Sequence, residues 1–341
     1  YKSFIKNTKI SLDKVENDSI REIIAKMIAY DRDERYANCS EIIADINKKL
    51  SENFPLETDE TREAYVLGAG FVGREKELSQ LTSWLDSEEI KVLLIHGEAG
   101  IGKSRLFEEF KHYCQLHGIE FFQGDGNDQI RKPFSLFLPI LNQIIAFTDD
   151  GLIEKYAPQL KKLLPDHVCF DGIEIAIRQD PKTEQGILIQ NVTNFLIDYA
   201  NSQKGKIALY LDSIQWSDDA SIETLEELMY KLQDLPDFEN LAGLRVYTSS
   251  REEGLEKFVK LRAKNRLEEM QLYPFDEQNV QTYMEAVFGV EKIDDSLKKE
   301  IPAINKKVGG NPYFLEQLIK SLVEKGLIQR QAKNWMLLES I

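Results

Sequence analysis

Short apolar segments alternate with helical patterns from residue 67 onward. Five apolar runs predict buried strands, at Val92–His96, Ile119–Phe122, Ile207–Leu211, Leu244–Thr248 and Leu267–Tyr273. Amphipathic periodicity predicts helices between them, for example over Glu75–Leu85, Ser104–Leu116 and Ile222–Leu232. Strands that alternate with helices indicate a mainly parallel sheet covered by helices on both faces, so the expected fold class is α/β.

The segment 125–205 contains no clear strand and is predicted to be a helical insertion. Its apolar spacing predicts helices over Phe134–Phe147, Ile153–Leu164 and Glu184–Ala200. With this insertion, the core domain is expected to span residues 67–274.

Helical patterns also dominate both ends of the chain. Residues 1–54 are predicted to form a small unit of two helices, followed by a polar, acidic linker over 55–66. Residues 275–326 are predicted to be helical, with N-caps at Asp276 and Asn311, Pro312 at a first helical position and Gly326 beyond a helix end. Residues 327–341 are predicted to form a hairpin.

Composition restricts the class of protein. The chain has 341 residues, of which 42% are hydrophobic and 30% charged, an ordinary globular mixture of about two domains. Lys and Arg number 43 against 58 Asp and Glu, giving a net charge of −15 that argues against nucleic-acid binding. Three widely spaced cysteines fit a reducing cytoplasm. No apolar run is long enough to span a membrane, and the chain is expected to be a piece of a longer cytoplasmic protein.

Residues 97–104 read GEAGIGKS and fit the phosphate-loop pattern G-x-x-x-x-G-K-[ST]. The segment follows an apolar strand and opens a helix, which is the context that this motif requires. Its glycines allow consecutive N–H groups to face phosphate oxygens. Lys103 is expected to reach the β- and γ-phosphates, and the Ser104 hydroxyl is expected to bind Mg²⁺.

A second apolar strand, IALYLD, ends in Asp212. An acidic residue at the end of a buried strand, together with the phosphate loop, predicts a Walker B carboxylate for the same metal ion.

Five ordered motifs together resemble a known family. They are FVGREKEL (Phe71–Leu78), GEAGIGKSRL, LDSIQWSDDAS (Leu211–Ser221), TSSRE (Thr248–Glu252) and GGNPYFLEQL (Gly309–Leu318). These motifs look like the AAA-type P-loop ATPase module of the signal-transduction ATPases with numerous domains (STAND), which are fused to bacterial regulators, cyclases and protein kinases. The resemblance covers about residues 67–326. It implies ATP or ADP and Mg²⁺ as cofactors, strand order 5-1-4-3-2, a helical lid over 275–326 and a winged-helix start at 327–341.

The resemblance also assigns roles to individual residues. Asp212 matches the Mg²⁺ ligand, Arg251 a γ-phosphate sensor, and Asp218 the acidic residue of the family's W-x-D motif, which is expected to contribute to catalysis. Pro312 matches a lid proline that packs against the base. The remaining nucleotide-contacting positions are Phe71, Val72, Gly73, Arg74, Gly97, Glu98, Ala99, Gly100, Ile101, Gly102, Lys103, Ser104 and Arg105.

One position departs from the family pattern. Ser213 stands where a second acidic residue normally follows the Walker B aspartate, and a serine hydroxyl is a poor base for activating water. Asp218, Asp219 or Glu98 is a candidate substitute. Slow hydrolysis and nucleotide binding without turnover therefore both remain open, and a DNA-loading initiator-type ATPase is a third alternative that the acidic charge disfavours.

The segment 20–50 resembles the last two helices of a Ser/Thr protein-kinase C-terminal lobe. Arg35 matches the arginine that pairs with the glutamate of the A-P-E motif in that family, yet the kinase glycine loop, H-R-D loop and D-F-G motif are absent here. The resemblance implies that neighbouring kinase and signalling domains, ATP and a nucleotide-dependent oligomer are the partners.

Overall fold

A computed structural model describes residues 12, 15, 17–29, 34–36, 39–54, 70–87, 89, 91–128, 132–175, 180–234, 243–288, 293–331 and 334–338. The chain divides into two compact units, Tyr1–Gly68 and Ala69–Ile341. The predicted linker 55–66 lies outside the described residues.

The first unit contains helices α2 (Asp18–Met27) and α3 (Cys39–Leu50). The Asn17 side chain caps α2 by accepting a hydrogen bond from the Ile20 N–H at 3.1 Å. Between the helices, Arg35 donates from Nε to the carbonyl of Ala29 at 2.7 Å. The two predicted helices are therefore present.

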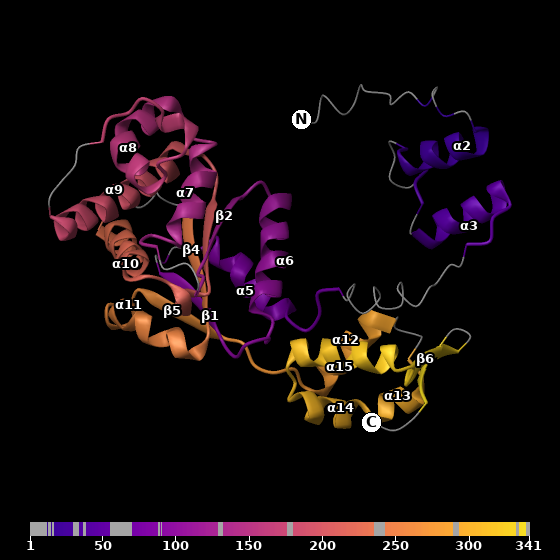
Figure 1. Ribbon diagram of the computed structural model, residues 1–341. Coiled ribbons are helices and arrows are strands. Elements are labelled where there is room, and N and C mark those ends of the chain that lie inside the picture. The colour runs from indigo at the N-terminus through magenta and orange to yellow at the C-terminus, as the bar shows by residue number, and fades with distance from the viewer. Residues whose placement is uncertain are drawn as a thin grey trace. The chain divides into compact units, whose positions relative to one another are not determined.

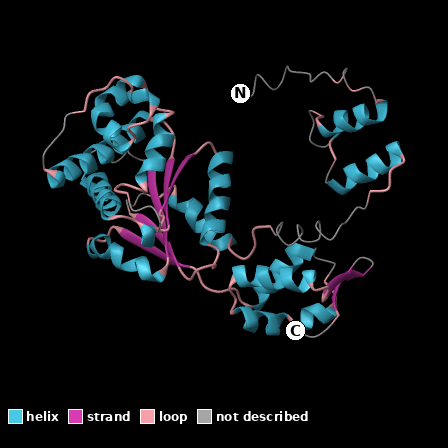
Figure 2. Cartoon of the chain, viewed as in Figure 1, coloured by secondary structure: helices cyan, strands magenta, loops and turns pink. Residues whose placement is uncertain are grey.

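A five-stranded parallel sheet forms the centre of the second unit (Figures 1 and 2). Its strands are β1 (Val92–His96), β2 (Glu120–Asp125), β3 (Ile207–Asp212), β4 (Leu244–Ser250) and β5 (Leu267–Gln271). The order is β2-β3-β4-β1-β5, which is the predicted order 5-1-4-3-2 read from the other edge. The predicted P-loop NTPase fold is thus confirmed, with β4 between the phosphate-loop strand and the Walker B strand.

Helices cover both faces of this sheet. One face packs against α5 (Glu75–Trp84) and α6 (Lys103–Leu116), where the Phe107 and Tyr210 rings stack with centroids 3.6 Å apart. The other face packs against helices of the insertion and α10 (Asp219–Asp234). Alternate residues of the central strands are buried in the two clusters, as expected for a parallel sheet between helical layers.

The insertion between β2 and β3 is helical, as predicted. It contains α7 (Phe137–Ile145), α8 (Asp150–Leu163), the short η2 (Val168–Phe170) and α9 (Pro181–Ser202). The prediction placed the first helix too early, because Phe134 has a left-handed backbone with φ of 65° and cannot continue a helix. It also ended β2 at Phe122, three residues short of Asp125.

The C-terminal part is mainly helical. Asp276 caps its first helix by accepting from the Asn279 N–H at 2.8 Å, and Gly326, with φ of 69°, follows its last helix, both as predicted. Besides β5, the described elements after β4 are η5 (Glu252–Phe258), α11 (Val259–Ala263), α12 (Glu277–Phe288), α13 (Asp295–Lys299), α14 (Ile301–Val308), α15 (Pro312–Glu324) and the antiparallel pair β6 (Ile328–Gln331) and β7 (Asn334–Leu337).

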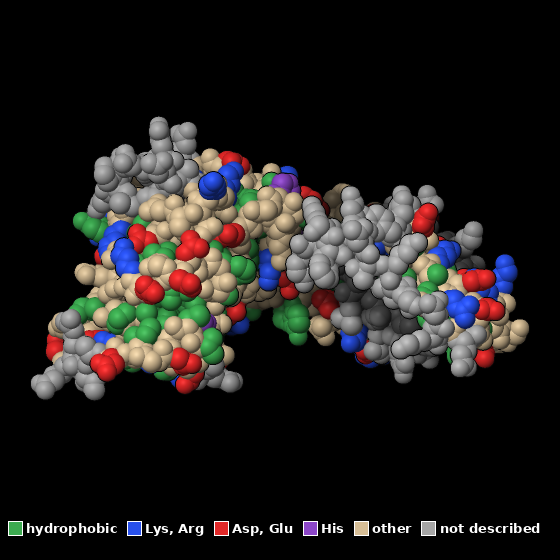
Figure 3. Space-filling view, turned by 90° about the horizontal axis from the view of Figure 1, so that it is seen from above, with side chains coloured by type: hydrophobic (Ala, Val, Ile, Leu, Met, Phe, Trp, Pro, Cys, Tyr) green, Lys and Arg blue, Asp and Glu red, His purple; other side chains and the backbone are tan. Residues whose placement is uncertain are grey.

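The surface carries charges of both signs. Figure 3 shows acidic side chains spread among basic and uncharged ones. Within the described ranges, every helix is too short or too polar to cross a membrane.

Candidate functional site

The phosphate loop connects the end of β1 to the start of α6. Three of its residues, Gly97, Gly100 and Gly102, have positive φ values of 151°, 77° and 101°. A Cβ atom on Gly97 would lie 2.9 Å from the Leu272 carbonyl oxygen, so a larger residue does not fit there. No side chain caps the first turn of α6, whose N–H groups therefore remain suited to an anionic ligand.

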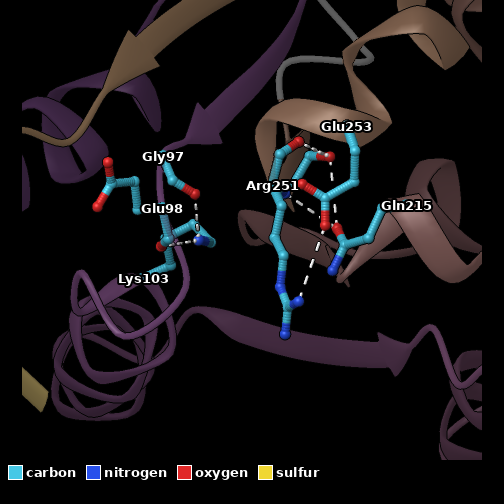
Figure 4. Close-up of polar contacts among 7 residues, drawn as sticks. Gly97, Glu98, Lys103, Gln215, Arg251 and Glu253 are labelled. Atoms are coloured by element: carbon cyan, nitrogen blue, oxygen red, sulfur yellow. Dashed lines mark hydrogen bonds and ion pairs between the residues drawn. The ribbon is translucent and has the colours of Figure 1, made fainter.

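Lys103 lies at the first position of α6 and folds back over the loop. Its ammonium donates to the carbonyls of Gly97 at 2.7 Å and Glu98 at 2.8 Å (Figure 4). Burial lowers the pKa of this ammonium, the Arg251 charge lowers it further, and Asp212 acts in the opposite direction. Lys103, Arg251 and Asp212 are thus close enough to influence one another electrostatically.

Asp212 ends β3 at the edge of the sheet from which the phosphate loop emerges. Its Oδ1 accepts a short hydrogen bond from the Ser249 hydroxyl and a longer one, 3.3 Å, from the Ser213 hydroxyl. Ser213 has φ of 55°, and its N–H donates to Ser249 Oγ at 3.1 Å. The Walker B turn is therefore held by β4, while position 213 offers only a hydroxyl.

The residues present fit Mg²⁺ held mainly through phosphates. The predicted oxygen donors are the hydroxyl of the exposed Ser104 and the carboxylate of Asp212. The described part of the chain has no cluster of three or more His, Cys, Asp or Glu side chains arranged for a metal ion. Mg²⁺ commonly uses one or two protein ligands together with substrate phosphates and water.

Arg251 follows β4 and sits beside the 3-10 turn η3 (Ile214–Trp216). Its N–H donates to Gln215 Oε1 at 3.1 Å, and its guanidinium lies 5.8 Å from the centre of the Trp216 ring. Arg251 Nη1 is 3.7 Å from Glu253 Oε1 (Figure 4), and 41% of the arginine side chain is exposed. The guanidinium is therefore partly accessible, and its role as a phosphate sensor stays a prediction.

Asp218 lies at the start of α10, and its carboxylate bonds to the insertion. Oδ1 accepts from the N–H groups of Phe134 at 2.9 Å and Ser221 at 2.9 Å. Oδ2 accepts from the Ser135 N–H at 3.0 Å and from the Ser135 and Ser221 hydroxyls, both at 2.7 Å. A carboxylate with these five donors caps α10 and anchors the insertion, and the catalytic role of Asp218 stays a prediction.

The Arg74 side chain bonds to the backbone of two distant segments. The side chain is buried, and Nη2 donates to the carbonyls of Ile101, at 3.3 Å, and Tyr273, in a short bond. Nη1 donates to Glu77 at 3.1 Å, and the guanidinium lies 5.0 Å from the Phe275 ring centre. Arg74 therefore connects the start of the module to the phosphate loop and to the segment after β5.

The other predicted nucleotide-contacting residues differ in burial and in their contacts. Phe71 and Val72 are partly buried, and a Cβ on Gly73 would touch the Phe275 ring at 3.2 Å. Ile101 is buried in the core, whereas Arg105 is exposed and pairs with Glu108 and Glu109 on α6. Pro312 is the first residue of α15. Glu98 and Ala99 are exposed loop residues whose carbonyls accept hydrogen bonds from Lys103 and Asn311, respectively.

Sequence reasoning missed two residues of this region. Asp125 ends β2 and pairs in register with Asp212, which places a second carboxylate on the neighbouring strand. Asn311 was predicted only as a helix cap, yet its Nδ2 donates to the Ala99 carbonyl at 2.8 Å. A prediction that extended β2 to residue 125 would have found Asp125. No local sequence signal indicates the bond between Asn311 and Ala99.

The sheet order, the glycine loop and the Walker B aspartate together define a P-loop NTPase. The family comparison narrows this class, because residues 70–239 match the model of the AAA ATPase domain. This part of the chain therefore has the sequence and the fold of an AAA-type P-loop ATPase module. No relative was found among curated proteins.

Several solved structures are weakly similar in fold. Drosophila ORC bound to DNA is 14% identical with a TM-score of 0.42, over 85% of this chain and 69% of that one. A chain of the Escherichia coli MS115-1 HORMA:CdnC:Trip13 complex is 12% identical with a TM-score of 0.46, over 84% of this chain and 90% of that one. A chain of the Saccharomyces cerevisiae Hsp104–ADP complex is 14% identical with a TM-score of 0.43, over 79% of this chain and 33% of that one. Similarity this weak carries no argument about substrate or assembly.

Proposed function

We propose that residues 67–326 bind Mg-ATP, hydrolyse it slowly and act as the nucleotide switch of a cytoplasmic, multidomain bacterial Ser/Thr protein kinase of the STAND type. The observation that carries the proposal is the phosphate loop. Its glycine backbone, the uncapped start of α6 and the Lys103 ammonium combine the three features that bind a polyphosphate.

ATP binding would exchange the partners of Lys103. Without nucleotide, its ammonium donates hydrogen bonds to two loop carbonyls. The β- and γ-phosphates are charged and offer it a stronger interaction. Ser104 and Asp212 would hold the metal ion, which neutralises phosphate charge when bound. Arg251 would contact the γ-phosphate, because its accessible guanidinium lies on the neighbouring strand end.

Slow turnover follows from the groups around position 213. The residue there supplies a hydroxyl, and Asp218 is committed to the insertion. The remaining carboxylates that could orient a water molecule are Asp125, Asp219 and Glu98. Positioned general-base catalysis contributes about 10²–10⁴-fold, so a poorly placed carboxylate costs much of that factor.

Ser213 also supports a second function, a nucleotide-gated scaffold that does not hydrolyse ATP. A single-turnover measurement with radiolabelled ATP and excess protein separates the two functions. Release of phosphate within minutes to hours, abolished by EDTA, supports the switch. Intact bound ATP over the same period supports the scaffold.

Nucleotide binding itself is tested by Lys103→Ala. Loss of one ammonium that makes charge-assisted bonds to two phosphates should weaken Mg-ATP binding at least about 100-fold in calorimetric titration. The thermal midpoint without nucleotide should stay nearly constant, because Lys103 bonds only to loop carbonyls. Lys111→Ala, on the exposed side of the same helix, is the matched control. Wild-type affinity in Lys103→Ala would contradict the assignment.

The kinase context is supported by the helix pair α2–α3 and by the Arg35 position between them. A longer chain that includes the preceding residues should phosphorylate Ser or Thr in a generic acceptor protein. Absence of phosphoryl transfer by that folded longer chain would count against this part of the proposal.

A further inference from the structure

The start of helix α15 is bonded directly to the backbone of the phosphate loop. Asn311 Nδ2 donates to the Ala99 carbonyl at 2.8 Å, and the Tyr313 N–H donates to the Gly100 carbonyl at 3.2 Å. Only 4% of Asn311 is exposed. A Cβ on Gly100 would lie 2.8 Å from Asn311 Oδ1, so the contact depends on bare backbone in the loop.

Four successive carbonyls of the loop are shared between two partners. Lys103 binds those of Gly97 and Glu98, and the start of α15 binds those of Ala99 and Gly100. The peptide group is planar, so a fixed carbonyl also fixes the N–H of the following residue. The Asn311 bond therefore sets the direction of the Gly100 N–H, and the Tyr313 bond sets the plane of the next peptide.

These two pairs of bonds respond differently to a nucleotide. Lys103 must leave its carbonyls to reach phosphates, whereas the bonds from α15 use carbonyls that a phosphate does not need. After binding, the bonds from Asn311 and Tyr313 would remain as restraints on Ala99 and Gly100.

We propose that Asn311 is a positioning residue that holds the phosphate loop in its binding conformation while the helical segment containing α15 is docked. This inference rests on the proposed nucleotide binding. It implies reciprocity: a docked α15 increases phosphate affinity, and bound nucleotide favours the docked state by the same factor.

Asn311 has a second role that the test must separate from the first. Its Oδ1 accepts from the Tyr313 N–H at 3.1 Å and thereby caps α15. Serine caps a helix about as well as asparagine but is too short to reach the Ala99 carbonyl, whereas alanine provides neither bond. Asn311→Ser therefore removes only the loop contact, and Asn311→Ala removes both contacts.

The experiment measures three quantities for each variant: hydrogen exchange of the loop peptide 97–104 without nucleotide, the thermal midpoint, and Mg-ATP and Mg-ADP affinities by calorimetry. Both variants should exchange the loop amides faster and bind both nucleotides about two- to tenfold more weakly, as expected for one lost hydrogen bond. Only Asn311→Ala should lower the thermal midpoint appreciably. Asp276→Ala removes the cap of α12, a bond from the Asn279 N–H that does not involve the loop, and should lower the midpoint and leave affinity unchanged.

Wild-type exchange and affinity in Asn311→Ser, with losses in Asn311→Ala alone, would show that Asn311 is only a helix cap and would overturn the inference. The proposed function fails separately, if the wild-type chain binds neither nucleotide. In that case loop exchange in the nucleotide-free protein still decides whether Asn311 holds the loop.

Discussion

Asp218→Asn should destabilise the ATPase module without abolishing ATP turnover by the folded protein. The variant keeps the shape of the side chain but replaces one carboxylate oxygen with an NH2 group. If the amide oxygen takes the place of Oδ1, it still accepts from the Phe134 and Ser221 N–H groups. The NH2 group then faces two serine hydroxyls, which can rotate to accept, and the Ser135 N–H, which loses this acceptor and keeps the Lys132 carbonyl at 3.2 Å.

The structure sets the size of the effect. Loss of one hydrogen bond to a charged group costs about 1.5–3 kcal/mol, and the other four bonds lose the assistance of the charge. The free energy of unfolding should therefore fall by about 2–4 kcal/mol, which corresponds to a thermal midpoint roughly 5 to 10 °C lower for a domain of this size. Asp219→Asn, at the exposed next position, is the matched control and should cost at most about 1 kcal/mol.

The pH dependence gives this prediction a second signature. Burial alone would raise the pKa of the Asp218 carboxyl, but hydrogen bonds from Ser221, Ser135 and backbone N–H groups outweigh it and hold the pKa below its ordinary value. A lowered pKa in the folded state stabilises the protein above the unfolded-state pKa of about 4, and this stabilisation is lost as the pH falls through the folded-state pKa. The gap in midpoint between wild type and Asp218→Asn should be constant above about pH 5 and should shrink below about pH 4.

Differential scanning fluorimetry across that pH range measures both effects. A midpoint within 1 °C of wild type near pH 7 would refute the anchoring role. A more than tenfold loss of ATP turnover per folded molecule at unchanged stability would support the catalytic assignment.

Two further predictions concern the water-activating group and the Arg74 contacts. Ser213→Asp should raise steady-state phosphate release by up to about 10²-fold without unfolding the turn, since aspartate tolerates a left-handed backbone. If Asp125 already supplies the carboxylate, Asp125→Asn should slow release and Ser213→Asp should have no effect; insensitivity to both changes would exclude both residues. Arg74→Lys keeps the charge but cannot reach all three partners, so stability should fall by about 1–3 kcal/mol and ATP and ADP affinity should fall together. An unchanged melting curve would show that the hydrogen bonds of the Arg74 guanidinium do not contribute to stability.

The sequence by itself determined the features that depend on local patterns. Apolar runs located all five strands, and the alternation of helices with strands established the parallel sheet. The phosphate loop and Asp212 were evident because glycine, lysine and aspartate are required at fixed spacings next to a strand end. Caps such as Asp276 and Asn311 were predicted for the same reason, since a cap bonds to a residue two or three positions away.

Only the tertiary structure determined the hydrogen-bond partners of the polar side chains in the site. Asn311 and Ala99 are separated by 212 positions, and Asp218 and Phe134 by 84. Arg74 meets Tyr273 across 199 positions, while Asp125 lies beside Asp212 because their strands pair in register. Periodicity and spacing describe how a residue relates to its neighbours along the chain. A buried amide, carboxylate or guanidinium instead bonds whichever donor or acceptor the folded sheet and helices bring within about 3 Å, because leaving it unpaired is costly.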